Sequence, residues 1–447
     1  MKDLTKGSPS RLILSFAIPI FFANLLQLTY SLVDTRIVGS FLGEDALAAV
    51  GATAPLFMML VVLTMGLSNG FTVVTGQRYG AGDLDGVRRS VAMSTMLSLF
   101  FVLIMMLIAT FALDPALAAM NVPEELFEDA KSYVLIISHG IIAMMGYNLL
   151  AGILRSLGDS KTPLYFLIIA TILNIFLALL FIIQFGWGVP GSAVALVIAQ
   201  GFSALLCIVY IVKKFPILRL QKQDWHFDWK FACEHLPMAV QFSVLGLGMI
   251  FIQAVCNKFG PTTIAAFTSA MRIEQLALQP MISFGLSMAV FSAQNFGAHR
   301  FDRIREGVKK CSLLALCFSL FAAVIMYFFG REMISIFISE ANEQVLSQAQ
   351  QYLHLSVPFY FFLSQIFIYR NAVQGMGIAM IPMFSGIVEL ILRTSAAVYL
   401  TEYFGYSGIC YASPIAWLGS SLFLFASYHY FIRLLEDSYK QHAGING

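Results

Sequence analysis

Polar side chains at helical spacing are the residues of this chain that could do chemistry. Four of them fall at intervals of three, four and three positions, so a helix places them on one face. They are Asn24, Gln27, Ser31 and Asp34. A charge in mid-membrane costs about 2.5–3.5 kcal/mol, so this face must meet a bundle interior or an aqueous cavity. The alternative, in which Asp34 only neutralises Arg36, leaves the other three unexplained.

A second pair lies in a later apolar segment. Thr171 and Asn174 are three positions apart, so a helix again places them on one face. An asparagine in the middle of a membrane helix either bridges helices through hydrogen bonds or helps to hold an ion or a proton. Spacing alone leaves both readings open.

The second half of the chain carries its own polar cluster. Arg272 and Glu274 lie two positions apart, so a helix points them in different directions, and we expect Glu274 to face a cavity. Glu389 and Arg393 lie four apart, where an ion pair can form along one helix face. We expect this pair to fix helix packing, and the alternative is a proton-responsive carboxylate held by its arginine.

The elements that position these residues must be membrane helices. The chain of 447 residues is 59% hydrophobic and 12% charged, with a mean hydropathy of +0.79. A spanning helix needs roughly 20 apolar residues, because lipid offers no partners to backbone polar groups. Twelve such runs are present, at 12–37, 47–75, 86–113, 130–154, 162–184, 190–213, 235–256, 264–292, 307–329, 347–374, 380–401 and 408–432.

The twelve runs form two copies of one unit. Gln77-Arg78-Tyr79-Gly80-Ala81 returns as Gln294-Asn295-Phe296-Gly297-Ala298, and the same offset pairs Gly43 with Gly260. Duplicated bundles are typical of secondary transporters. The repeat predicts an all-α integral membrane protein with an N-lobe at 1–213, a cytoplasmic or interfacial linker at 214–234 and a C-lobe at 235–447. Two six-helix lobes that face the same way are related by a pseudo-two-fold axis along the membrane normal.

Charge predicts the orientation. Most of the 27 Lys and Arg residues fall in connections on one side of the predicted membrane, and Arg370 is expected to be one of them. Because basic residues favour the cytoplasmic side, both termini are expected in the cytoplasm of a multi-pass protein of the cytoplasmic membrane. The net charge of +2 gives no sign of a nucleic-acid partner.

Several classes of function are excluded by missing motifs. The glycines between Gly76 and Gly82 join two membrane helices and follow no strand, so they do not form a phosphate-binding loop. The His and Cys residues show no metal-ligand spacing, and no cofactor is expected. An intramembrane enzyme would need a nucleophile beside a base, and Asp34 has no His or second carboxylate at short spacing.

These residues resemble the multidrug and toxic compound extrusion (MATE) family along essentially the whole chain. The matching segments are Pro19, Val33-Asp34-Thr35-x-x-Val38-Gly39, Gly43 to Ala49, Gly66-Leu67-Ser68, Gln77-x-x-Gly80-Ala81, Gly285-Leu286-Ser287 and Gln294-x-x-Gly297-Ala298. The resemblance implies two six-helix lobes around a central cleft that alternates between inward-open and outward-open states. It also implies export of amphipathic organic cations in exchange for H⁺ or Na⁺.

The resemblance carries over to single residues unevenly. Asp34 matches the first-helix aspartate of the family's N-lobe cation site, and Asn174 matches its asparagine. Ala178 stands where the family has an acidic residue, and Leu196 where it has a threonine. Because Na⁺ needs several oxygen ligands and a proton needs one carboxylate, these departures favour H⁺.

The acidic pair that another branch of the family carries in its C-lobe is also missing. Leu245 and Leu363 lie near the expected places, so the cluster of Glu274, Glu389 and Arg393 is a feature of this chain. The sequence therefore predicts a monomeric, proton-coupled antiporter of small amphipathic, cationic molecules, with Na⁺ coupling as one alternative. A flippase for anionic lipid-linked intermediates is a weaker alternative, because it would need a cationic cleft.

Overall fold

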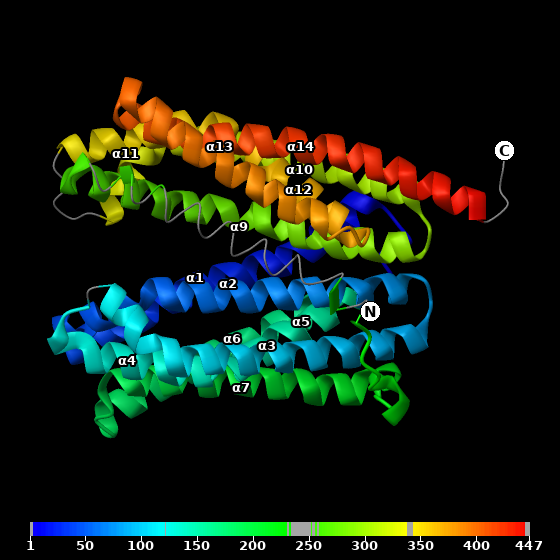
Figure 1. Ribbon diagram of the computed structural model, residues 1–447, viewed down its shortest axis with the longest axis horizontal. Coiled ribbons are helices and arrows are strands. Elements are labelled where there is room, and N and C mark those ends of the chain that lie inside the picture. Colours follow the sequence, from blue (N-terminus) through cyan, green and yellow to red (C-terminus); the bar gives the residue numbers. More distant parts are fainter. Residues whose placement is uncertain are drawn as a thin grey trace. The chain divides into compact units, whose positions relative to one another are not determined.

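The computed structural model describes residues 3–120, 122–229, 259–337 and 343–442, together with 232, 233, 252, 255 and 256. Within these residues the regular elements are all helical (Figure 1). Ten helices are long and apolar enough to cross a membrane, and a bent pair, α4 and α5, makes an eleventh span. The twelfth predicted span, 235–256, lies almost entirely outside the described residues. The prediction of an all-α membrane protein is confirmed.

The chain divides into two compact units. The first contains Met1–Asp3 and Phe22–Ala239, and the second contains Leu4–Phe21 and Val240–Gly447. The helix α1 (Pro9–Leu42) therefore begins in the second unit and ends in the first. The sequence repeat had assigned residues 4–21 to the first half of the chain. Pro19 lies just before the division, where its missing N–H allows a helix to bend.

The first unit is a bundle of long helices. The helix α2 packs against α3, α4 and α5, and α7 packs against α4, α5 and α6. The bounds are α2 (Glu44–Gly80), α3 (Leu84–Ala119), α4 (Glu124–His139), α5 (Ile141–Ser156), α6 (Lys161–Leu179) and α7 (Gly188–Lys214), with a π-helical turn, η1 (Leu180–Gln184), after α6.

The second unit repeats this design. The helix α9 packs against α10, α11 and α12, while α13 packs along α14. The bounds are α9 (Pro261–Gly297), α10 (Phe301–Phe337), α11 (Glu343–Ser356), η5 (Val357–Phe359), α12 (Tyr360–Gly375), α13 (Met380–Phe404) and α14 (Tyr406–His442).

Equivalent helices in the two units begin with the same backbone device. Gly43 precedes α2 with φ of 91°, and Gly260 precedes α9 with φ of 87°. This left-handed conformation is easy only for glycine, because other side chains clash with the backbone there. The sequence repeat is therefore a repeat of local geometry.

The connection between the repeats is docked on the first unit. It forms two short 3₁₀ turns, η2 (Pro216–Leu218) and η3 (Lys222–Asp224). Asp224 is buried, and its carboxylate lies 3.4 Å from Nε of Arg88 in α3. Trp225 and Trp229 are exposed, in keeping with the expected interfacial segment.

The N-terminal segment is built into the second unit (Figure 1). Leu4 is 1% exposed, and its backbone N–H donates to Oε1 of Gln294 at 3.0 Å. The guanidinium of Arg303 donates to the carbonyl oxygens of Leu4 at 3.2 Å and Gly7 at 2.9 Å, and to Oδ1 of Asn295 at 3.0 Å. One buried arginine thus holds the segment that leads into α1.

We predict that Arg303→Ala lowers the free energy of unfolding by about 2–4 kcal/mol, because two buried acceptors and the partly buried carbonyl oxygen of Gly7 lose a charged donor. Thermal unfolding of the purified protein in detergent measures the loss. The control is Arg305→Ala, because Arg305 forms a half-exposed ion pair with Glu436, and such pairs contribute little. Equal losses in the two variants would contradict the role assigned to Arg303.

Candidate functional site

Asp34 is a buried carboxylate in the first unit. It is 8% exposed, and Oγ of Ser192 in α7 donates a hydrogen bond to its Oδ1 at 2.9 Å. Arg36 is exposed, and no ion pair joins it to Asp34 among the described residues. The alternative in which Asp34 only neutralises Arg36 therefore does not hold in this structure.

The other residues of the predicted polar face of this helix are buried to different degrees. Asn24 is buried and Gln27 is half-buried, whereas the side chain of Ser31 lies outside the described residues. Tyr30, which the sequence analysis missed, lies one helical turn before Asp34. The hydroxyl of Tyr30 is buried and has no hydrogen-bond partner within the described part of the chain.

Asn174 of α6 is 2% exposed, and neither its Oδ1 nor its Nδ2 has a hydrogen-bond partner in the described residues. Thr171 differs, because its hydroxyl donates to the carbonyl oxygen of Leu167 at 2.8 Å, within its own helix. A buried amide without partners is costly and rare in proteins. Asn174 is thus the more informative member of the predicted pair.

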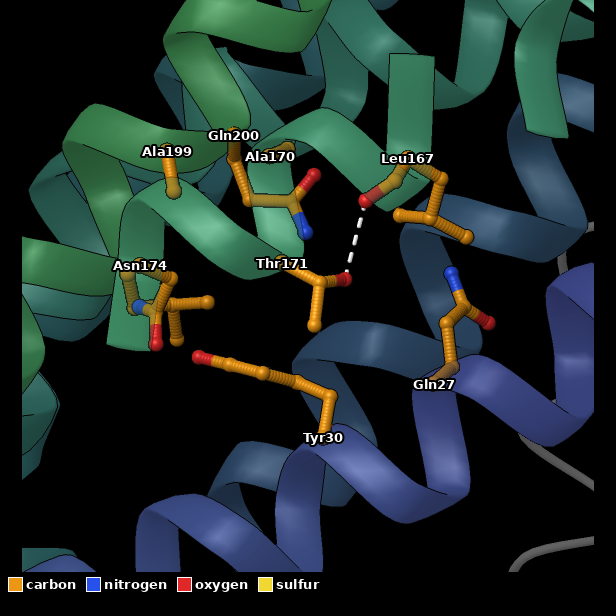
Figure 2. A pocket seen from close by; sticks show the side chains of 9 residues that line it. Gln27, Tyr30, Leu167, Ala170, Thr171, Asn174, Ala199 and Gln200 are labelled. Atoms are coloured by element: carbon orange, nitrogen blue, oxygen red, sulfur yellow. Dashed lines mark hydrogen bonds between the residues drawn. The ribbon is translucent and has the colours of Figure 1, made fainter. Parts of the chain in front are cut away.

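Asn174, Tyr30 and Gln27 meet at a small cavity (Figure 2). The hydroxyl of Tyr30 points toward Asn174, and the amide of Gln200, whose Oε1 also lacks a partner within the described residues, borders the same space. About 20 Å³ is open to the centre of a water-sized molecule, enough for about one water. The lining residues are Gln27, Tyr30, Leu167, Ala170, Thr171, Asn174, Leu196, Ala199 and Gln200.

The residues at and near the cavity include one hydroxyl that the sequence did not predict. Leu196 lines the cavity with an apolar side chain, and Ala178 is fully buried, so neither supplies an oxygen. Ser192, one helical turn before Leu196, supplies the hydroxyl that reaches Asp34. Its i−4 spacing from Leu196 was the available signal.

In the second unit the predicted pair of Glu389 and Arg393 forms a buried ion pair. Nη2 of Arg393 lies 2.5 Å from Oε1 of Glu389. The sequence analysis placed Arg370 in a cytoplasmic connection, and this was wrong. Arg370 is buried in α12, with Nη2 at 3.1 Å from Oε2 of Glu389 and Nε donating to Oγ of Ser385 at 3.1 Å. One carboxylate is therefore shared by two guanidinium groups.

Glu274 is separated from its neighbour in sequence, as the spacing of two predicts. Arg272 is exposed, while Glu274 is 3% exposed. The hydroxyl of Tyr352 in α11 donates to Oε2 of Glu274 at 3.1 Å. No ion pair to Glu274 occurs among the residues that the structure describes.

Proton exchange is one chemistry that buried carboxylates of this kind can support. No group of three or more His, Cys, Asp or Glu side chains that could hold a metal ion occurs in the described ranges. A buried carboxylate without a cationic partner is costly when ionised, and a bound proton removes that cost. Asp34 and Glu274 are of this kind, whereas Glu389 contacts two guanidinium groups.

Comparison with known proteins assigns the chain to a family. A family model described as MatE matches residues 19–180 and 237–398. The probable multidrug resistance protein YpnP of Bacillus subtilis is 27% identical over 439 residues and covers 96% of each chain. The probable multidrug resistance protein NorM of Thermotoga maritima is 26% identical over 412 residues, which cover 88% of this chain and 86% of NorM.

Solved structures share the fold. A crystal structure of MATE in the bent conformation matches with a TM-score of 0.91 and 22% identity, over 97% of this chain and 98% of that one. A MOP superfamily transporter from Pyrococcus furiosus matches with a TM-score of 0.90 and 23% identity, over the same shares. At these identities the likeness concerns the fold alone.

We predict that Asn174→Leu leaves the free energy of unfolding unchanged or raises it by up to about 2 kcal/mol, because it removes an unpartnered buried amide. Thermal unfolding in detergent measures the change. The control is Tyr147→Phe, which removes a satisfied buried hydrogen bond to the carbonyl oxygen of Pro163 at 3.0 Å and should lose about 1 kcal/mol. A loss with Asn174→Leu at least as large as the control's would mean that Asn174 bridges helices instead.

Proposed function

The chain belongs to the MATE family of multidrug efflux transporters, and we propose that it exports amphipathic organic cations in exchange for protons. The proposed route is alternating access of its substrate site to the two sides of the membrane. As a member of a family of multidrug transporters the protein acts on small molecules and is not an enzyme. The coupling ion, the positive charge of the substrate and the exchange are the parts proposed here.

The burial of Asp34 without a counter-ion is the observation that carries the proposal. In its ionised form the carboxylate accepts from Ser192 but has no cationic partner in the described residues. Such a charge costs several kcal/mol in a low-dielectric interior. Uptake of one proton removes this cost, so the protonation of Asp34 can favour one conformation over another.

The neighbours of Asp34 offer a way to transmit protonation. A protonated carboxyl gains one O–H donor, whereas the ionised form only accepts. Tyr30, on the same helix, and Asn174, across the cavity, have buried polar atoms without partners in the described residues. In the proposal, protonation redistributes hydrogen bonds among these groups and a cavity water, and this shifts α1 relative to α6 and α7.

The cavity composition supports H⁺ over Na⁺. A sodium ion prefers several hard oxygen ligands, and the two positions that would add them carry Ala178 and Leu196. The polar groups that border the cavity are amides and hydroxyls without charge. One carboxylate suffices for a proton, so a proton site does not need oxygen ligands at these two positions.

The charges of the second unit support a cationic substrate over an anionic one. Arg370 and Arg393 are both committed to Glu389 and are not available to an anionic lipid-linked intermediate. This observation favours the exporter over the flippase. Because one chain carries both units, the proposal needs no second copy, and we propose that the transporter acts as a monomer.

The proposed location is the cytoplasmic membrane, with both termini in the cytoplasm. Exposed basic residues gather at one end of each unit, with Arg78 in the last turn of α2 and Arg300 after α9. Acidic residues gather at the start of α4, where Glu124 and Glu125 lie at the opposite end of the first unit. Basic residues retained on the cytoplasmic side explain this asymmetry.

We predict that inverted vesicles containing the protein take up ethidium under an imposed pH gradient and not under a Na⁺ gradient. Asp34→Asn cannot exchange a proton at this position, so its pH-driven uptake should fall to the level of empty vesicles. The matched control is Asp85→Asn, which changes an exposed carboxylate in α3 and should retain wild-type uptake. Fluorescence of the dye measures uptake in all three.

Two outcomes would overturn the proposal. Concentrative uptake by Asp34→Asn would show that Asp34 does not couple transport to protons. Uptake driven by Na⁺ alone would show that the gaps at Ala178 and Leu196 are filled by other oxygen ligands, with Gln27 and Gln200 the nearest candidates.

A further inference from the structure

A second carboxylate without a cationic partner lies in the other unit of the chain. Glu274 is 3% exposed on α9, and it accepts a hydrogen bond from the hydroxyl of Tyr352 at 3.1 Å. Neither Asp34 nor the cavity that Tyr30 and Asn174 line belongs to this unit. The proposed coupling at Asp34 therefore leaves Glu274 unexplained.

Glu389, in the same unit, serves as an internal comparison. It is 5% exposed, much like Glu274, but it contacts two guanidinium groups at 2.5 and 3.1 Å. Removing its charge would leave Arg370 and Arg393 buried without a carboxylate, and that is strongly unfavourable. Glu389 is thus a structural carboxylate, and Glu274 is not held in this way.

The titratable and charged groups that face Glu274 come from several packed helices. Tyr352 comes from α11, Tyr360 from the start of α12, and Arg393 from α13 acts on Glu274 at longer range. On α14, Cys410 faces Tyr352 and not the carboxylate directly. Among the described residues, Arg393 is the one basic group of this set, and Glu389 already binds it.

The two tyrosines can satisfy Glu274 in both of its protonation states. The ionised carboxylate accepts from Tyr352. The hydroxyl of Tyr360 is fully buried beside the same carboxylate. A hydroxyl both donates and accepts, so Tyr360 can accept the O–H of a protonated Glu274. A site that suits both states can bind and release a proton without unfolding.

The surroundings favour a proton over a larger ligand. The side chain of Glu274 is 3% exposed, so it is almost entirely covered from bulk solvent. No metal-binding group of three His, Cys, Asp or Glu side chains occurs in the part of the chain that is described. The one carboxylate and its two hydroxyls fit the smallest cation.

We propose that Glu274 is a second proton-binding site, located in the second unit and protonated independently of Asp34. Its use in transport rests on the proposed function, in which proton entry on one side and exit on the other drives export. The proton passes between water and a carboxylate oxygen, and no other bond is made or broken. With this site, each half of the duplicated chain carries one exchangeable proton, on helices that are not equivalent in the repeat.

Infrared difference spectroscopy of the reconstituted protein tests the site without transport. A protonated carboxyl group has a C=O band distinct from that of a carboxylate. Spectra are compared between about pH 5.5 and pH 9, above the range in which exposed carboxyls titrate, near pH 4. In Asp34→Asn protein we expect one protonated-carboxyl band to remain at the lower pH, and we expect it to be absent from Asp34→Asn/Glu274→Gln.

Two controls keep the result interpretable. Asp85→Asn in the Asp34→Asn background should retain the band, because the side chain of Asp85 is exposed and pairs with Arg88 in the first unit. Tyr360→Phe keeps Glu274 but removes its hydroxyl neighbour, so the band should shift in frequency, even if Glu274→Gln does not fold. A band that survives Glu274→Gln, or one that Tyr360→Phe leaves unshifted, would overturn the proposal.

The two proposals fail in different ways. If pH-driven dye uptake depends on Asp34 but no second carboxyl band occurs, the site at Glu274 is wrong and the proposed function stands. If the band occurs but dye uptake does not depend on the pH gradient, Glu274 binds a proton and the proposed coupling is wrong.

Discussion

An ionised carboxylate buried in a low-dielectric helical bundle must be compensated, and this constraint accounts for the polar interior of the chain. Compensation takes two forms here. Glu389 is neutralised by the guanidinium groups of Arg370 and Arg393, which join α12 and α13. Asp34 and Glu274 have only hydroxyl donors in the described residues, Ser192 and Tyr352, so a proton is the compensating charge available to them. Fixed ion pairs stabilise the packing, and uncompensated carboxylates can change state.

The two halves of the chain share a backbone design but differ in their buried polar residues. Gly43 and Gly260 precede equivalent helices with nearly the same positive φ, and the Gln-x-x-Gly-Ala motif at the end of α2 returns at the end of α9. The polar residues do not repeat, since the first unit carries Asp34 on α1 and the second carries Glu274 on α9. The first half of α1 adds a further asymmetry, because Arg303 fastens its leading segment to the second unit while Asp34 belongs to the first.

The membrane spans could be predicted from the sequence. A segment that crosses lipid must satisfy its backbone hydrogen bonds internally, as a helix, and such a helix is visible in the sequence as a long apolar run. Asp34, Asn174, Glu274 and Glu389 could be found because polar residues in such runs need a reason. Contacts between helices could not be predicted from a single sequence. Arg370 was placed in a connection because it lies near a helix end, whereas packing against α13 buries it. Ser192 and Tyr352 were missed because an ordinary hydroxyl gains its role only from the carboxylate that faces it.

Carbodiimide labelling of the protein in lipid, mapped by mass spectrometry near neutral pH, tests the division of buried carboxylates most directly. Carbodiimides react with protonated carboxyl groups in apolar surroundings and leave carboxylates paired with arginine unmodified. The account predicts modification of Asp34 and Glu274, decreasing as the pH rises, and none of Glu389. Modification of Glu389, or protection of Asp34 at every pH while Glu274 reacts, would contradict it.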